Sequence, residues 1–276
     1  MLLNKYTCTV IALLFPLVIL AHGDLSIRIA NVTTEISKDT GNASLYFDRG
    51  FLYQQHEEFN NALNDYMKSE SLGYVGDVLH YRTAEVYFAL NEFSMALAST
   101  NKYGNMSDVK IRKLRAQILL KLNRYSEALN DYNFVVNNLL DITPSDIIEY
   151  SEIFLLIKRT NFEEAVKAID MGLKKLGNGV ITLRSKKIEY LIKWNQSERV
   201  IQEYDALIAE FSRKEFWYYK KALFLYEINR ISECELALQQ VDASIKELSP
   251  RFKNTPAIKD LRVDLLNFEK KLSDKN

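Results

Sequence analysis

Cysteine, histidine, proline and glycine are all scarce in this sequence of 276 residues. The chain has 2 Cys, 3 His, 4 Pro and 9 Gly, and neither charge sign is in excess because Lys+Arg and Asp+Glu both number 36. The shortage of helix breakers, together with 47% hydrophobic residues, favours packed helices and argues against disorder. The balanced charge gives no reason to expect nucleic acid as a partner, because phosphate binding requires a basic surplus.

The few cysteines and histidines exclude several kinds of site. Cys8 lies in the apolar N-terminal segment, so a chain that loses this segment keeps only Cys234 and has no internal disulfide. Three histidines are too few for a histidine-based site once His22 leaves with that segment or lies beside its end. The sequence contains no metalloprotease motif, nucleophile elbow, phosphate-binding glycine loop or zinc spacing. We therefore predict no catalytic residues, no metal and no cofactor.

The N-terminal segment, 1–23, follows the order of a secretory signal peptide. Lys5 supplies the charged start, Val10 to Leu20 form an apolar run broken only by Pro16, and Ala21-His22-Gly23 ends it with small residues. This run is shorter than the roughly 20 apolar residues that a membrane-spanning helix needs, which favours cleavage over a retained anchor. No second run of spanning length follows, so we expect no integral membrane span after cleavage.

Small residues recur at a nearly constant spacing along the rest of the chain. These anchor positions are Ala62, Ala96, Ala128, Ala165, Val200 and Cys234. A period of about 34 residues, which these positions follow, is typical of stacked helix-turn-helix units. Small side chains where the two helices of a unit cross let their axes approach to the roughly 8–10 Å of packed helices. At such a position Cys234 is expected to be a buried structural thiol and not a reactive one.

The segments around these anchors resemble tetratricopeptide repeats (TPR). Phe59-Asn-Asn-Ala62-Leu-Asn-Asp-Tyr66 and Tyr125-Ser-Glu-Ala128-Leu-Asn-Asp-Tyr132 carry the resemblance most clearly. It implies an all-α fold, a right-handed α-solenoid (superhelix) of about six TPR helix-turn-helix units with helical caps. The predicted organisation is a signal peptide over 1–23, an N-terminal capping half-repeat over 24–41, the TPR solenoid over 42–248 and a C-terminal capping helix over 249–276.

The resemblance also implies a partner-binding groove. In TPR proteins the first helix of each pair lines the concave face, and its second, fifth, ninth and twelfth positions contact ligands. Carried over, these positions give Phe47, Phe51, Gln54, Tyr81, Glu85, Phe88, Lys110, Lys113, Gln117, Tyr150, Phe154, Tyr219 and Tyr226. Aromatic side chains offer contact area and lysines hold carboxylates, so this groove suits an extended or helical segment with acidic residues. In the alternative interpretation the aromatics pack against the neighbouring repeat and the lysines only keep the helix soluble.

The functional prediction is a non-catalytic scaffold or adaptor of the cell envelope that binds a protein or peptide. The carboxylate clamp of cytosolic cochaperones is absent, since Phe47, Phe51 and Arg82 stand at three of its positions. The segment from Ala21 to His56 resembles exported TPR proteins of Gram-negative bacteria, which favours the periplasm or secretion. The alternatives are an endoplasmic-reticulum cochaperone that binds unfolded chains and a regulatory subunit of an envelope enzyme. The sequence identifies neither the partner nor the oligomeric state.

Overall fold

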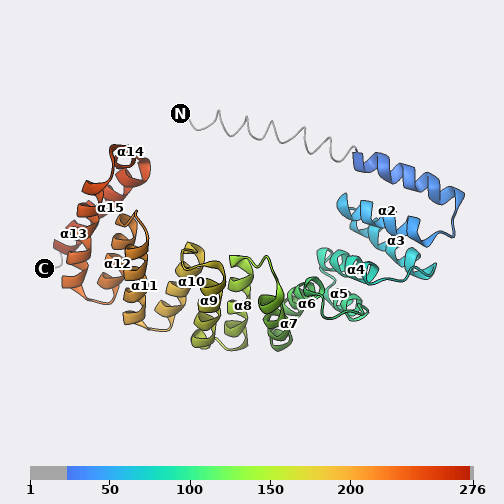
Figure 1. Cartoon of the computed structure of the whole chain (residues 1–276), viewed down its shortest axis with the longest axis horizontal. Helices are drawn as coiled ribbons and strands as arrows, with labels where there is room; N and C mark the ends of the chain where they lie inside the picture. The colour runs from blue at the N-terminus through green and yellow to red at the C-terminus, as the bar shows by residue number, and fades with distance from the viewer. Residues whose placement is uncertain (1–23, 274–276) are drawn as a thin grey trace. The chain divides into compact units, whose positions relative to one another are not determined.

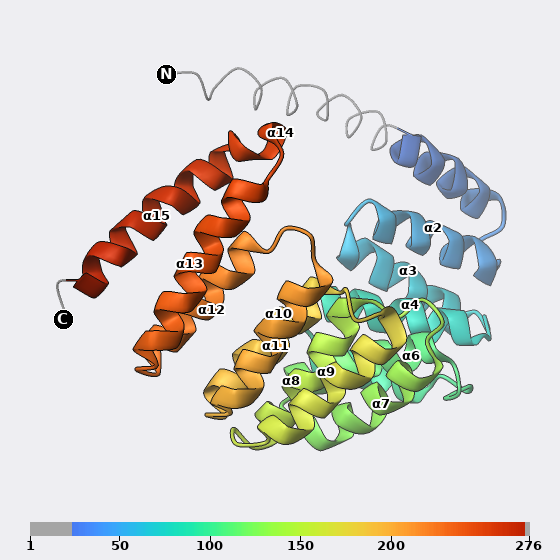
Figure 2. The same ribbon diagram turned by 60° about the vertical axis from the view of Figure 1, so that its left-hand side comes forward.

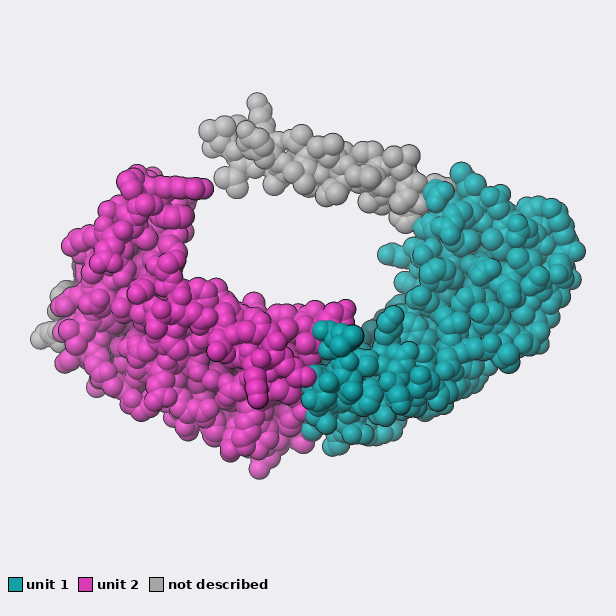
Figure 3. Space-filling model, viewed as in Figure 1, with its two compact units in different colours: residues 1–140 teal, residues 141–276 magenta. Residues whose placement is uncertain are grey.

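The computed structural model describes residues 24–273, and every regular element in this range is a helix (Figure 1). The predicted signal peptide, residues 1–23, lies outside the described residues. The chain divides into two compact units, Met1–Leu140 and Asp141–Asn276, which are coloured separately in Figure 3. Within residues 24–273 no helix is both long enough and apolar enough to cross a bilayer.

Unit 1 begins, in its described part, with a helix over residues 24–38. Three helix pairs follow it: α2 (Ala43–Gln55) with α3 (Phe59–Ser71), α4 (Asp77–Ala89) with α5 (Phe93–Asn101), and α6 (Val109–Lys121) with α7 (Tyr125–Asn138). The helix over 24–38 packs its apolar stripe towards α2, with Ile36 buried and Leu25, Ile29 and Val32 half-buried. This is the packing expected of a helix that caps a stack of repeats.

Unit 2 contains three further pairs and two more helices. The pairs are α8 (Pro144–Ile157) with α9 (Phe162–Leu176), α10 (Ile181–Lys193) with α11 (Ser197–Glu210), and α12 (Glu215–Glu227) with α13 (Ile231–Glu247). A short helix α14 (Pro250–Lys253) then leads to α15 (Pro256–Ser273). The side chains of α15 that the sequence places on one apolar face are all buried: Ile258, Leu261, Leu265, Phe268 and Leu272.

The predicted anchors occupy equivalent places in the six pairs. Each lies near the start of the second helix of its pair, and all six have no exposed surface. A close helix crossing explains this. A Cβ atom added to Gly50 of α2 would lie 2.8 Å from ring carbons of Tyr66 in α3, and one added to Gly172 of α9 would overlap Ile147 of α8. The predicted all-α fold of stacked helix pairs is therefore confirmed for the described residues.

The turns within the pairs use one backbone device. In residues 24–273, five of the six turns place a residue other than glycine in the left-handed region with φ between 57° and 62°: Glu57, Asn91, Asn123, Asn195 and Asn229. Asparagine tolerates this region better than most residues because its short polar side chain bonds locally. The fourth pair has the β-branched Thr160 at this point. There the residue that caps the C-terminus of α8, Lys158, has an extended backbone conformation.

Candidate partner-binding surfaces

Two of the predicted groove residues of α2 differ in how they are used. Phe47 stacks on Tyr74 with ring centroids 4.8 Å apart and lies 5.7 Å from the ring of Tyr66. It belongs to the core cluster around Leu79 and is a packing residue. Phe51 instead lies beneath the guanidinium carbon of Arg82, which is 4.7 Å from its ring centroid. This distance is within the range of a cation–π contact.

A polar network joins α2, α3 and α4 beside Phe51. The hydroxyl of Tyr66 donates to Oε1 of Gln54 at 2.7 Å, and Nε2 of Gln54 donates to Oε2 of Glu85 at 3.1 Å. Nη1 of Arg82 donates to the same oxygen of Glu85 at 2.8 Å. Gln54 and Glu85 are among the predicted groove residues, whereas Arg82 is not. The network fixes the rotamers of all three side chains before any partner arrives.

Tyr81 stands beside this network. Its burial, and the negative charge of Glu85 next to it, raise the pKa of Tyr81 to about 12. Burial also raises the pKa of Tyr66 well above its ordinary value. Both phenols therefore keep their protons at neutral pH and can donate hydrogen bonds. We define the surface network of unit 1 as Phe51, Gln54, Tyr81, Arg82 and Glu85.

Of the other predicted groove residues of unit 1, some pack against the core and others lie at the surface. Phe88 packs edge-on against Phe93 at 5.6 Å and, like Tyr81, contacts the core cluster that includes Ile111 of α6. Lys110 is exposed in the first turn of α6, while Lys113 and Gln117 are half-buried. Phe47, Tyr81 and Phe88 therefore pack against core clusters of this unit while remaining half-buried.

In unit 2 the first helices present apolar side chains. Tyr150 is buried and its ring lies edge-on to Phe154 with centroids 5.3 Å apart, while Phe154 is only half-buried. Ile157 of α8 and Ile192 of α10 are 40% and 38% exposed at corresponding places of their helices. These are large fractions for isoleucine, which is among the residues most often buried.

Tyr219 and Tyr226, the predicted groove residues of α12, are covered by α15. The ring of Phe268 lies 6.3 Å from that of Tyr219 and 5.2 Å from that of Tyr226, edge-on to both. Nζ of Lys271 is 4.9 Å from the Tyr226 ring centroid. Figure 2 shows α15 running beside α12 and α13. The sequence could not reveal this contact. Both α12 and α15 are amphipathic helices, and nothing in the sequence of one identifies the other as the helix that it packs against.

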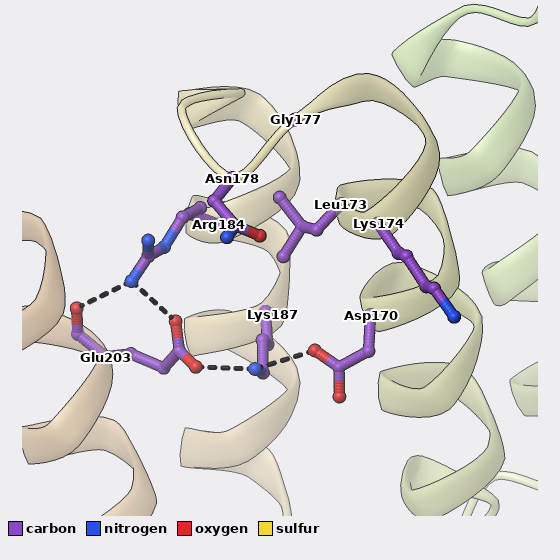
Figure 4. Close-up of a pocket in the computed structure, with 8 residues that line it drawn as sticks. All are labelled: Asp170, Leu173, Lys174, Gly177, Asn178, Arg184, Lys187 and Glu203. Atoms are coloured by element: carbon purple, nitrogen blue, oxygen red, sulfur yellow. Dashed lines mark hydrogen bonds and ion pairs between the residues drawn. The ribbon is translucent and has the colours of Figure 1, made fainter.

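A charged cleft lies on another face of α10, towards α9 and α11 (Figure 4). Its volume is about 470 Å³, and it is lined by Asp170, Leu173, Lys174, Gly177, Asn178, Arg184, Lys187 and Glu203. Nζ of Lys187 lies 2.6 Å from Oδ1 of Asp170 and 2.5 Å from Oε1 of Glu203. Nη2 of Arg184 lies 3.1 Å from Oε2 of Glu203, and the buried Nε of Arg184 has no hydrogen-bond partner. No spacing in the sequence marks this cleft, because its lining comes from three helices and the α9–α10 loop.

Burial raises the pKa of the Cys234 thiol to about 11, so Cys234 is neutral at neutral pH and a weak nucleophile. Within residues 24–273 no group of three or more His, Cys, Asp or Glu residues is arranged to hold a metal ion.

No protein-family model matches this sequence, and no curated protein matches it significantly. Solved structures do resemble its fold. The C-terminal part of a TPR repeat-containing protein from Cytophaga hutchinsonii has a TM-score of 0.61 at 12% identity, over 86% of this chain and 94% of that one. A tetratricopeptide repeat protein from Parabacteroides merdae has a TM-score of 0.53 at 15% identity, over 89% and 93%. YrrB, described as a TPR protein with an unusual peptide-binding site, has a TM-score of 0.52 at 19% identity, over 62% and 87%.

The internal evidence and these neighbours agree. In the described residues there are six helix pairs, each with one buried anchor, and five of their turns place a left-handed residue at the same point. Two of the solved structures that resemble the chain over most of its length are described as tetratricopeptide-repeat proteins. The fold of this chain is that of the tetratricopeptide-repeat proteins.

Proposed function

We propose that this chain is a non-catalytic scaffold or adaptor that binds a protein or peptide through the exposed faces of the first helices of its repeats. The observation that carries the proposal is the surface network of unit 1. It combines an aromatic face, a partly exposed cation and a partly exposed carboxylate, all held in place by contacts within the chain. Arginine and tyrosine are among the residues that most often dominate the energy of protein interfaces.

The network is suited to an extended backbone or to a helix with polar side chains. The side chains of Arg82 and Glu85 are 31% and 26% exposed, and their ion pair uses one nitrogen of a guanidinium that has five N–H donors. The remaining donors can reach a partner's carbonyl or carboxylate, and Glu85 can accept from a backbone N–H. Because the side chains are already ordered, little conformational entropy is lost on binding. YrrB, which resembles this chain only in fold, supports the proposal through its own peptide-binding site.

The test is a pull-down from an extract of the source organism with the full chain as bait. Wild type is compared with Phe51→Ser/Arg82→Ala, which removes the aromatic face and the cation but leaves the core residues Phe47 and Tyr66 intact. Glu163→Ala/Lys167→Ala, an exposed pair on α9, is the matched control. We expect the network variant to lose the partner and the control to keep it, with both melting within a few degrees of wild type. A folded network variant that keeps the full set of partners would show that this surface is not the binding site.

We further propose that the chain works in the cell envelope, periplasmic or secreted. The support is the order of residues 1–23, which is that of a cleaved secretory signal. Mass spectrometry of the chain recovered from its source should find Asp24 as the first residue in an exported fraction. Recovery of the uncleaved chain from the cytosol would contradict the proposal. Asn105 and Asn195 each begin an Asn-x-Ser glycosylation sequence, and glycans attached to either would instead support the endoplasmic-reticulum alternative.

A further inference from the structure

The face of α12 that carries Tyr219 and Tyr226 already holds a helix. The ring of Phe268 of α15 packs edge-on against both tyrosines, and Lys271 places its ammonium group over the ring of Tyr226. Both tyrosines stand at positions where the first helix of a repeat was predicted to contact a partner. The contacts of α15 therefore show that this face of α12 binds a helix.

The chemistry of the bound helix is simple. Its buried residues Ile258, Leu261, Leu265, Phe268 and Leu272 follow one another at alternating spacings of three and four positions. This is the single apolar seam of an amphipathic helix, which packs into an apolar groove without needing a specific backbone contact. The opposite side of α15 faces solvent, and there Val263 and Leu266 are 56% and 66% exposed.

α15 packs on α12 and α13 less closely than these two helices pack on each other. The backbones of α12 and α13 approach each other closely, whereas the backbone of α15 stays farther from both. Phe268 and Lys271 reach the tyrosines of α12 through their side chains. The connection that precedes α15 contains Pro250, the short helix α14 and Pro256, so α15 does not continue α13. Helices joined through side-chain ends and a non-helical connection can separate without breaking the hydrogen bonds of either one.

We propose that the face of α12 with Tyr219 and Tyr226 is a helix-binding surface, occupied within the chain by α15, and that an amphipathic partner helix takes the place of α15. The partner helix carries an apolar seam with an aromatic residue at the place of Phe268 and a basic residue three positions later. The inference rests on the proposed function only in its use of the first helices as the binding face. Release of α15 would at the same time expose its apolar seam, so the partner must supply enough contact area to replace it.

The test uses a fluorescent synthetic peptide with the sequence of residues 256–273 as the probe and the full chain as the receptor. In wild type the site is occupied, and binding of the peptide should be weak. In Phe268→Ala the internal helix loses its anchor, and the same peptide should bind at least tenfold more tightly. Adding Tyr226→Ala to this variant should abolish the gain, and Leu266→Ala, on the exposed side of α15, should behave as wild type. Equal binding to wild type and Phe268→Ala would overturn the proposal.

Amide hydrogen exchange of the wild-type chain is a second test of the proposal and needs no variant. We expect the amides in the middle of α15 to exchange at least tenfold faster than those in the middle of α12 and α13. Equal protection in the three helices would show that α15 is an integral part of the fold, and this too would overturn the proposal. Both measurements use only this chain and its own peptide. A failure of the pull-down at Phe51 and Arg82 would therefore not affect them, and their failure would leave that result standing.

Discussion

The helix pairs α6/α7 and α10/α11 use the same places of the repeat with different side chains. In α6/α7 the crossing positions are Ala116 and Ala128, both fully buried, and the two helices pack closely. In α10/α11 they are Ile188 and Val200, and α10 packs more closely on α9 than on α11. Larger side chains at a crossing hold the axes apart. The charged cleft of Figure 4 lies beside α10 and is lined by residues of α9, α10 and α11.

The ion pairs of the two crossings differ in the same way. Arg115 donates to both oxygens of Asp131 at 2.6 and 2.7 Å, and Asp131 has no exposed surface. The corresponding pair of α10/α11 is Lys187 with Glu203, which shares its carboxylate with Arg184 at the edge of the cleft. Nη1 of Arg112 also donates to Oδ1 of Asp131, so each crossing holds one carboxylate between two cations. The two crossings differ in burial, because the Asp131 side chain is fully buried whereas that of Glu203 is 15% exposed.

The largest expected effect comes from removing the enclosed carboxylate. Asp131→Ala leaves Arg115 and Arg112 without their shared partner and should lower the free energy of unfolding by about 3–5 kcal/mol. Glu203→Ala, at the corresponding place beside the cleft, should cost at least about 2 kcal/mol less because its cationic neighbours keep other carboxylates. Urea unfolding of both variants measures the difference. Equal losses would show that enclosure does not distinguish the two repeats.

The next effect comes from giving α6/α7 the larger anchor of α10/α11. Ala128→Val adds two methyl groups to a crossing without free space and should destabilise the chain by about 1–3 kcal/mol. Asn130→Val on the exposed side of α7 is the control, since it adds the same β-branched side chain without a crossing helix. Its cost should stay below about 1 kcal/mol. If the two costs are the same, side-chain size at the crossing does not control the approach of the helices.

A third prediction concerns Cys234, which takes the anchor place in α12/α13. Its folded pKa is raised to about 11 from an ordinary value near 9, so the unfolded chain releases the thiol proton first as the pH rises. Stability contributed by the neutral thiol is therefore complete below about pH 9 and lost between pH 9 and 11, by about 1–2 kcal/mol. Urea unfolding of wild type and Cys234→Ala at pH 7.5 and 10.5 tests this, because tyrosine ionisation affects both alike. The difference between the two chains should shift in favour of Cys234→Ala at pH 10.5, and a constant difference would refute the assignment.

The smallest expected effect concerns an ion pair on an exposed helix face. Lys167 and Glu163 of α9 lie 2.7 Å apart with side chains 66% and 55% exposed. Lys167→Ala should change the free energy of unfolding by less than any of the preceding substitutions, and 0.5 M NaCl should remove most of that change. A loss comparable to that of Asp131→Ala would mean that burial does not set the strength of ion pairs in this chain.

Much of the fold was readable from the sequence because its signals are local. The six anchors recur at a nearly constant period, and each proved to be buried at a helix crossing. The apolar face of α15 from Ile258 to Leu272 can also be read from the sequence, since the helical period alone specifies which side chains share a face. The predicted groove positions stay a prediction, although the structure places Phe51, Gln54, Tyr81 and Glu85 together.

Other features depend on contacts between segments far apart in the sequence. Arg82 joins the surface network only because α2 and α4 bring Phe51 and Glu85 to it. The cleft beside Arg184 needs three helices to form. Neither arrangement has a sequence motif, because the side chains come from different repeats and no fixed spacing connects them.

The sequence by itself therefore determined the helices, their pairing and the buried stripe of each one, because helical period and side-chain size act within a few turns of chain. Only the tertiary structure decided what each exposed face meets. It placed Arg82 over Phe51, brought Arg184 and Lys187 of α10 into a cleft with residues of α9 and α11, and packed Phe268 against Tyr219 and Tyr226. The physical reason is that hydrophobic burial is not directional. An amphipathic face specifies that it must be covered, and the three-dimensional stacking of the repeats selects what covers it.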